Sequence, residues 1–234
     1  TVYAQDSWEV SPRLRVNLGV RAEGQFMSGD TGVAFWIAPE IAPRVGVVFQ
    51  PGELGVQKVY GSVGRFYEQI PMWAAGIWTG LASQTYGTYP QNPLVDTTGG
   101  VVQGGSSVGE GVGRNLKGQY YDEVTAGYER RLGRAYRIGV RGTFRTLRWA
   151  VDDGAPDPDS PWTMGNPGRG ALAYLPRARR DYTALELTLE RSGGPLTFLA
   201  SYVISRNRGN YTGLFATAPG HFGPHSGPQF AFPE

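Results

Sequence analysis

Apolar and polar residues alternate with a period of two over several stretches of this chain. In 13–23, Leu14, Val16, Leu18 and Val20 share one face, while arginine, asparagine and glutamate residues share the other. The same alternation recurs in four further segments: 123–129, 136–145, 184–190 and 196–205. This period is typical of β-strands with one apolar and one polar face. Glycines interrupt nearly every candidate helical period, so the chain is predicted to be all-β.

Three weaker segments, 2–10, 44–50 and 56–67, bring the prediction to eight strands of roughly nine to twelve residues each. Four hairpins are expected, over 1–26, 41–67, 122–149 and 181–206.

The predicted connections alternate strictly between short and long. The short ones lie near 11–12, 51–55, 132–134 and 192–195, and the long ones over 27–43, 68–121, 153–180 and 207–234. Short turns at one end and long external loops at the other are typical of outer-membrane β-barrels. A tilted membrane strand also needs about nine to eleven residues. We therefore predict one domain over 1–234, an antiparallel up-and-down transmembrane barrel wall.

Each face of the predicted wall has its own chemistry, and a membrane barrel places the apolar face outward. The residues predicted to face lipid are Leu14, Val16, Leu18, Val20, Ile138, Val140, Phe144, Leu185, Leu187, Leu189, Phe198 and Tyr202. The residues predicted to face the lumen are Arg15, Arg21, Glu129, Arg137, Arg141, Arg145, Glu186 and Glu190. Pairing among these lumen charges favours a structural role over direct ligand contact.

The short turns also predict a register. A turn centred on Gly133 places Glu129 opposite Arg137, and a four-residue turn at 192–195 places Leu189 opposite Phe198. Both pairings keep each face uniform, as cross-strand packing requires.

Composition excludes several classes of chemistry. The chain has no cysteine, which rules out thiolate metal sites, and only two histidines, His221 and His225. A hydrolase built on histidine is therefore hard to assemble, and neither an enzyme nor a cofactor is expected. The net charge of +2 argues against a nucleic-acid partner.

Two clusters are candidate binding groups. Asp152, Asp153, Asp157 and Asp159 form an oxygen-rich loop of the kind that calcium favours, but their spacing is not that of an EF-hand, so a solvated loop is the favoured interpretation. Trp73, Trp78, Tyr86 and Tyr89 crowd the longest connection. They are candidate ligand contacts of an external loop, with an interfacial aromatic girdle or simple loop packing as alternatives.

The ordered series of strands resembles the outer-membrane segment of TonB-dependent receptors, in particular the Oar-like branch with a carboxypeptidase-regulatory-like N-terminal domain. The matching stretches are 3–8 (YAQDSW), 14–21 (LRVNLGVR), 42–46 (APRVG), 61–67 (GSVGRFY), 122–130 (DEVTAGYER), 181–189 (DYTALELTL), 201–206 (SYVISR) and 209–215 (GNYTGLF). The resemblance covers nearly all strands and little of the loops.

That resemblance implies a bacterial outer-membrane barrel of about 22 strands that is closed by a plug. Eight strands cannot make such a barrel, so we expect this chain to be an internal piece of a larger receptor. The implied partners are outer-membrane lipid, the rest of the barrel with its plug, the TonB system acting through the missing N-terminal part, and an unidentified ligand. The implied function is energised transport of that ligand, inward or outward.

Three alternatives stay open at this point. A complete eight-stranded membrane barrel with a structural or adhesive role has the right strand count. A barrel enzyme would have to use His221 or His225. A soluble β-sandwich that binds carbohydrate would bury Leu185, Leu187 and Leu189 between two sheets.

Overall fold

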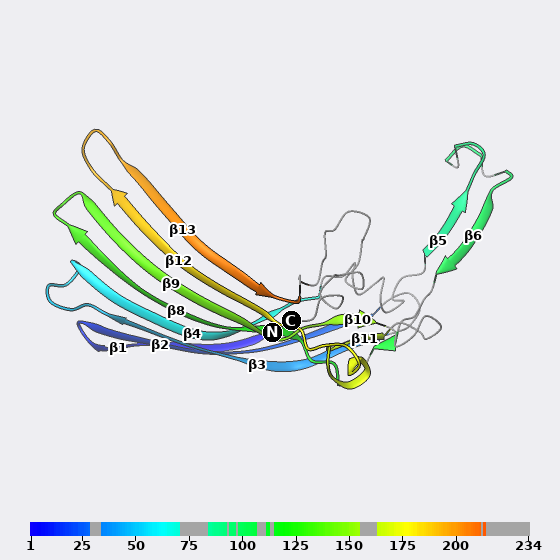
Figure 1. Ribbon diagram of the computed structural model, residues 1–234, viewed down its shortest axis with the longest axis horizontal. Coiled ribbons are helices and arrows are strands. Elements are labelled where there is room, and N and C mark those ends of the chain that lie inside the picture. The colour runs from blue at the N-terminus through cyan, green and yellow to red at the C-terminus, as the bar shows by residue number, and fades with distance from the viewer. Residues whose placement is uncertain are drawn as a thin grey trace.

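A computed structural model describes residues 1–28, 34–70, 84–92, 94–96, 98–106, 111–112, 115–154, 163–211 and 213. They form one curved eight-stranded antiparallel sheet and two small sheets (Figure 1). The strands of the main sheet are β1 (Val2–Ser11), β2 (Leu14–Ser28), β3 (Ala34–Phe49), β4 (Gln57–Glu68), β8 (Gln119–Leu132), β9 (Tyr136–Trp149), β12 (Arg180–Arg191) and β13 (Phe198–Gly209). Within this part of the chain, no helix has the length and apolarity to cross a bilayer.

Each strand of the main sheet pairs with its neighbour in the order β1-β2-β3-β4-β8-β9-β12-β13. This is the up-and-down arrangement that the sequence predicts, and the predicted eight strands are confirmed. The sheet is open, however, because β1 and β13 form its two edges and do not pair with each other in the described residues. A complete eight-stranded barrel would join these edges, so that alternative is wrong for this structure.

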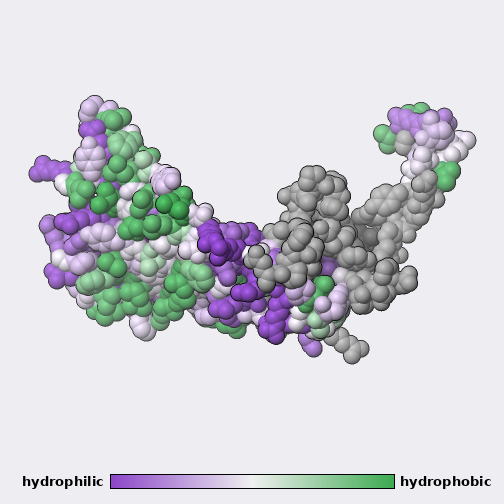
Figure 2. Space-filling view, viewed as in Figure 1, coloured by the Kyte–Doolittle hydropathy of each residue, from purple (hydrophilic) through white to green (hydrophobic). Residues whose placement is uncertain are grey.

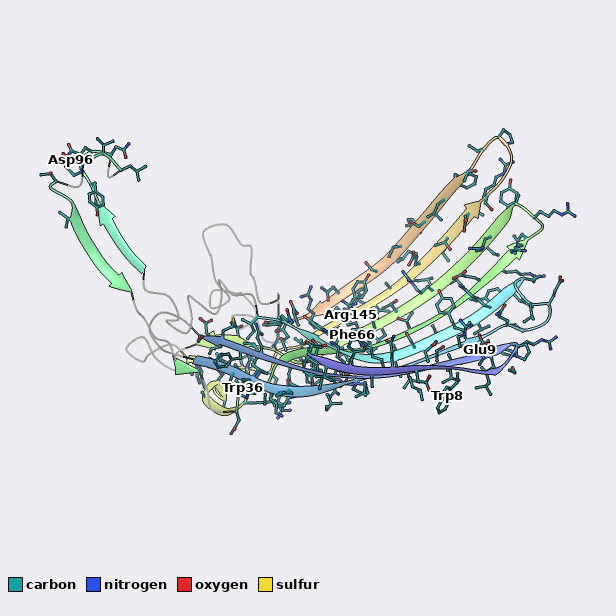
Figure 3. All side chains as sticks on the ribbon, turned by 180° about the vertical axis from the view of Figure 1, so that it is seen from behind. Trp8, Glu9, Trp36, Phe66, Asp96 and Arg145 are labelled. Carbon is teal, nitrogen blue, oxygen red and sulfur yellow. The ribbon has the colours of Figure 1, made fainter. Side chains whose placement is uncertain are left out.

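The sheet curves so that one face is convex and the other concave (Figure 3). Trp8 lies on the convex side and its neighbour Glu9 on the concave side, as the alternation of a strand requires. One hydrogen-bonded row of the convex face runs across the sheet through Leu14, Phe49, Val59, Tyr128, Val140, Leu187 and Tyr202. The twelve residues predicted to face lipid share this face, and the eight predicted to face the lumen share the other.

The strands extend further than predicted, to 15 residues in β2 and 16 in β3. Most of 27–43 is therefore strand rather than loop, which corrects the predicted loop and the start of the hairpin at 41. The physical reason is a register shift between Glu23 and Gln25, where Pro39 and Gly24 interrupt the pairing. Beyond it the alternation of β3 changes phase, so Trp36 is exposed and Ile37 is buried.

Both predicted registers are wrong by two residues. Tyr136 pairs with Leu132 across a three-residue turn, so Glu129 lies opposite Gly139 instead of Arg137. Phe198 pairs with Arg191, and Leu189 lies opposite Ala200. A six-residue turn makes this possible, because Gly193 and Gly194 both take positive φ, 86° and 78°. A shift of two leaves every side chain on its predicted face.

The most deeply buried residues lie where the long connections leave the sheet. Here β10 (Asp152–Gly154) pairs with β11 (Thr163–Gly165), which also pairs with β7 (Gly111–Val112). A short 3-10 helix, η1 (Gly170–Leu172), packs against β11 and buries Leu172 completely. The hairpin of β5 (Gln84–Thr88) and β6 (Val101–Ser106) forms a separate sheet (Figure 1).

Candidate functional site

Charged side chains pair across neighbouring strands on the concave face. Lys58 of β4 bonds Glu129 of β8 at 3.0 Å, and Arg145 of β9 bonds Glu123 of β8 at 2.5 Å. The remaining cross-strand pairs are Arg137–Glu190, Arg141–Glu186 and Arg15–Glu9. Arginine suits such pairs because its planar fork matches a carboxylate. The concave face therefore satisfies most of its charge within the sheet.

Arg44 of β3 differs from these cations, because it has no carboxylate partner among the described residues. Its guanidinium carbon lies 4.4 Å from the centre of the Phe66 ring, and its Nε has no hydrogen-bond partner. Its row neighbours are Gly19 and Gly64, so no side chain flanks it on either adjacent strand. A hollow of about 680 Å³ lies here, lined by Arg44 and the polar side chains Gln5, Ser7, Asn17 and Ser62 among others.

The convex face is apolar over a continuous band. Leu185, Leu187 and Leu189 are 42, 44 and 38% exposed, although nothing in their chemistry favours water. Figure 2 shows hydrophobic residues gathered over the strands of the main sheet. Exposed apolar surface of this extent marks an interaction with a membrane or another apolar partner.

The convex band ends abruptly toward the long connections. Asp122 of β8 accepts hydrogen bonds from Arg65 at 2.9 Å and from Arg148 at 3.0 Å. On the neighbouring strand, the Thr146 hydroxyl donates to Asp181 at 2.6 Å. Polar side chains therefore replace apolar ones at the same face positions, and they define one edge of the band.

A buried group of hydrogen-bonded residues, which we call the loop-end polar cluster, joins the long connections to the sheet. It consists of Gln119, Val151, Asn166 and Tyr211. The Tyr211 hydroxyl lies 2.8 Å from both Gln119 Oε1 and the Val151 carbonyl oxygen. The Asn166 amide donates to the carbonyl oxygens of Lys117 and Ala150 at 2.9 and 2.7 Å. These side chains supply partners to backbone groups that have no strand beside them.

The ionisable groups at the loop end respond to this burial. Burial raises the pKa of the Tyr211 phenol well above its usual value, and the charge of Asp152 adds to the effect. Burial also raises the pKa of Tyr174, which lies near Asp153. Because the pKa of Tyr211 is raised in this way, Tyr211 stays a neutral hydrogen-bonding group over the physiological range. In the β5–β6 connection, the pKa of Asp96 is instead lowered by hydrogen bonds from Thr98.

The predicted candidate clusters are only partly described. Asp152 and Asp153 are buried in β10, whereas Asp157 and Asp159 lie outside the described residues. No group of three or more metal-ligating side chains forms within the described ranges. Tyr89 is half-buried, only the backbone of Tyr86 is described, and Trp73, Trp78, His221 and His225 lie outside. Sequence reasoning missed Arg44 and Tyr211, because their surroundings come from strands and loops that are distant in sequence.

Comparison with known proteins agrees with this architecture. No family model matches the chain. A curated relative, the TonB-dependent transporter Oar of Myxococcus xanthus, is 26% identical over 258 aligned positions. That alignment covers 95% of this chain and 24% of the relative. The predicted resemblance to TonB-dependent receptors is confirmed. The chain thus spans about a quarter of the relative's length.

Solved structures show the same fold. The FrpB iron transporter of Neisseria meningitidis matches in its apoprotein form with a TM-score of 0.58 and 13% identity, over 97% of this chain and 28% of that one. A second structure of FrpB matches with a TM-score of 0.52 and 14% identity over the same shares. The open sheet therefore shares its fold with about a quarter of each of these two chains. These proteins are described as transporters and not as enzymes.

Proposed function

We propose that this chain forms wall and external loops of an outer-membrane TonB-dependent transport receptor. The TonB-dependent transporter that aligns with nearly the whole chain supports the receptor class. In this account the convex band contacts lipid, the concave face lines the lumen, and the long connections lie outside the cell. A plug within the same protein and the TonB system would supply gating and energy for moving an unidentified ligand.

The observation that carries this proposal is the slant of the apolar band relative to the hydrogen-bonded rows. One row joins Val16 of β2, Val47, Gly61, Ala126, Gly142, Leu185 of β12 and Ile204 of β13. On β12 and β13 the band ends at this row, because Thr183 and Arg206 follow. On β4, β8 and β9 it continues for two more residues. On β2 it reaches Ala22, six residues beyond Val16, and the exposed ring of Phe26 follows beyond Gly24, ten residues from Val16.

This slant gives an angle. Six to ten residues correspond to roughly 20–34 Å along a strand, and the six strand-to-strand steps from β2 to β13 correspond to roughly 29 Å. The edge of the band therefore runs at roughly 35–50° to the rows. Strands of outer-membrane barrels are tilted by roughly 35–45°, so a level membrane boundary would produce such a slant. A soluble barrel would instead place its apolar band on the concave face.

Surface labelling tests the proposed placement, since the chain has no cysteine of its own. Leu94, 93% exposed in a long connection, and Arg134, in the short β8–β9 turn, are each replaced by cysteine in the full-length receptor freed of other cysteines. We expect a membrane-impermeant maleimide to label Leu94→Cys in intact cells and Arg134→Cys only after permeabilisation. Labelling of neither variant before permeabilisation would contradict the proposal.

A permeability assay tests the transport architecture. Removing the plug from the full-length receptor should make cells sensitive to a bulky polar antibiotic such as vancomycin, because a barrel of about 22 strands encloses a wide lumen. A correctly inserted plugless protein that leaves cells resistant would show a narrow, filled barrel instead.

A further inference from the structure

The Arg44 hollow offers a charge that is not paired with any carboxylate of the described residues. The cross-strand cations of β2, β4 and β9 on the concave face are paired with Glu9, Glu129, Glu190, Glu186 and Glu123. Arg44 instead rests on the ring of Phe66. A cation at membrane depth that faces a barrel interior normally finds a partner or marks a transport path.

The sequence around Arg44 keeps the hollow open. A Cβ atom at position 64 would lie 3.2 Å from Arg44 Cγ and 3.2 Å from the Phe66 ring. Glycine at position 64 therefore lets the arginine stem and the ring pack together. Gly19 on the other side adds no side chain beside Arg44. The guanidinium is thus held by stacking, with hydrogen-bonding capacity left for another group.

The carboxylates near the hollow do not compete for Arg44. Glu123 lines the hollow but accepts from Arg145 at 2.7 Å. Asp6 accepts from the backbone nitrogen of Ser7 at 2.8 Å and from the Trp8 indole. The other polar lining groups, such as Asn17 and Ser62, are neutral and can donate hydrogen bonds. The hollow therefore combines one available cation with neutral donors.

We propose that Arg44 forms an anion subsite on the transport path, which receives a carboxylate or phosphate group of the passing ligand. This proposal rests on the proposed receptor function and narrows its ligand class to molecules that carry such a group. The guanidinium fork matches the two oxygens of either group, and Ser62 and Asn17 donate to the remaining ones. Phe66 fixes the plane of the fork.

Calorimetric titration of the full-length receptor in nanodiscs with citrate, and separately with inorganic phosphate, tests the subsite. We expect saturable binding of at least one anion and an affinity at least about tenfold weaker in Arg44→Gln. Arg44→Lys, which keeps the charge but loses the fork, should lie between the two. The matched control Arg148→Gln removes a cation from the convex face and should change the affinity less than about twofold.

Two outcomes would overturn the subsite. One is equal anion binding by the wild type and Arg44→Gln. The other is a wild type that binds neither anion while Arg44→Gln lowers the unfolding temperature, which would show that a carboxylate of the receptor itself already occupies Arg44. Heat-modifiable gel mobility and the cysteine labelling above are measured on the same variants. They establish insertion independently, so failure of the subsite is distinguishable from failure of the receptor assignment.

Discussion

The two faces of the main sheet differ in how their side chains are accommodated. On the concave face, side chains find partners on the next strand, as Lys58 does with Glu129 and Arg145 with Glu123. On the convex face, Leu185 and Leu187 remain 42 and 44% exposed. Both faces belong to the same strands, and successive side chains point to opposite faces. The difference therefore lies entirely in which residues occupy alternate positions.

This contrast supports the proposed placement of the sheet, with an apolar environment on the convex side and a polar one on the concave side. A polar face that pairs within the sheet needs no covering layer, whereas an apolar face of this size must be removed from water. The loop-end polar cluster extends the contrast, because there the chain buries polar groups and pairs them in hydrogen bonds with side-chain amides. The stability of the wall should therefore depend most on the convex face, less on the loop-end polar cluster and least on the ion pairs of the concave face.

The largest expected effect comes from placing a charge on the convex face. Ala126 and Thr125 are neighbours on β8 that face opposite sides, and Ala126 lies between Gly61 and Gly142, where an arginine side chain has space. Ala126→Arg should destabilise the receptor in liposomes by roughly 2–4 kcal/mol, because a cation would face hydrocarbon. Thr125→Arg, the matched control, should cost less than roughly 1 kcal/mol. Urea unfolding measures both, and equal effects would contradict the assignment of the faces.

A smaller effect is expected at the loop-end polar cluster. Tyr211→Phe removes the hydroxyl that lies between Gln119 Oε1 and the Val151 carbonyl oxygen, so the buried carbonyl loses this partner while Gln119 Oε1 keeps the Val151 N–H. We expect a local loss of roughly 2 kcal/mol, seen as faster hydrogen exchange in 147–153 and at 210–211. Tyr202→Phe, on the exposed convex side, is the control and should leave exchange unchanged. Unaltered hydrogen exchange in Tyr211→Phe would show that the hydroxyl does not stabilise the loop-end polar cluster.

Close packing on the concave face gives a third test. The ring of Tyr60 covers Gly127 on the next strand, and a Cβ at position 127 would overlap its phenol atoms. Gly127→Ala should therefore cost roughly 1 kcal/mol by forcing the ring aside. In the double variant Tyr60→Ala with Gly127→Ala, the alanine at 127 should add no further loss. An additive double-variant cycle would mean that the two residues are not coupled.

The smallest effect is expected from the concave ion pairs. Arg141 is about half exposed and bonds Glu186. Arg141→Gln should change the free energy of unfolding by no more than about 1 kcal/mol, because solvent screens such a pair. Raising the ionic strength should reduce even this difference. A loss comparable with that of Ala126→Arg would show that the ion pairs, and not the apolar band, dominate the stability of the wall.

Local alternation predicted the strands and their faces, because parity survives a two-residue register error. The six-residue turn that begins at Ser192 was not predictable from the alternation, since its length depends on how Gly193 and Gly194 use positive φ. The length of β3 was hidden by the phase change beside Pro39. Tyr211 contacts Gln119 across 92 residues, and no local pattern signals that contact. The isolation of Arg44 likewise depends on glycines contributed by both neighbouring strands.

The most direct test of the central claim is a nitroxide scan along 184–190 of β12 in the full-length receptor, reconstituted in bilayers. Accessibility to oxygen, which concentrates in lipid, is compared with accessibility to a water-soluble nickel complex. We expect oxygen maxima at 185, 187 and 189 and minima at the even positions, in phase with the convex face. Odd positions shielded from both reagents would mean that the convex face packs against protein, which would contradict the membrane wall.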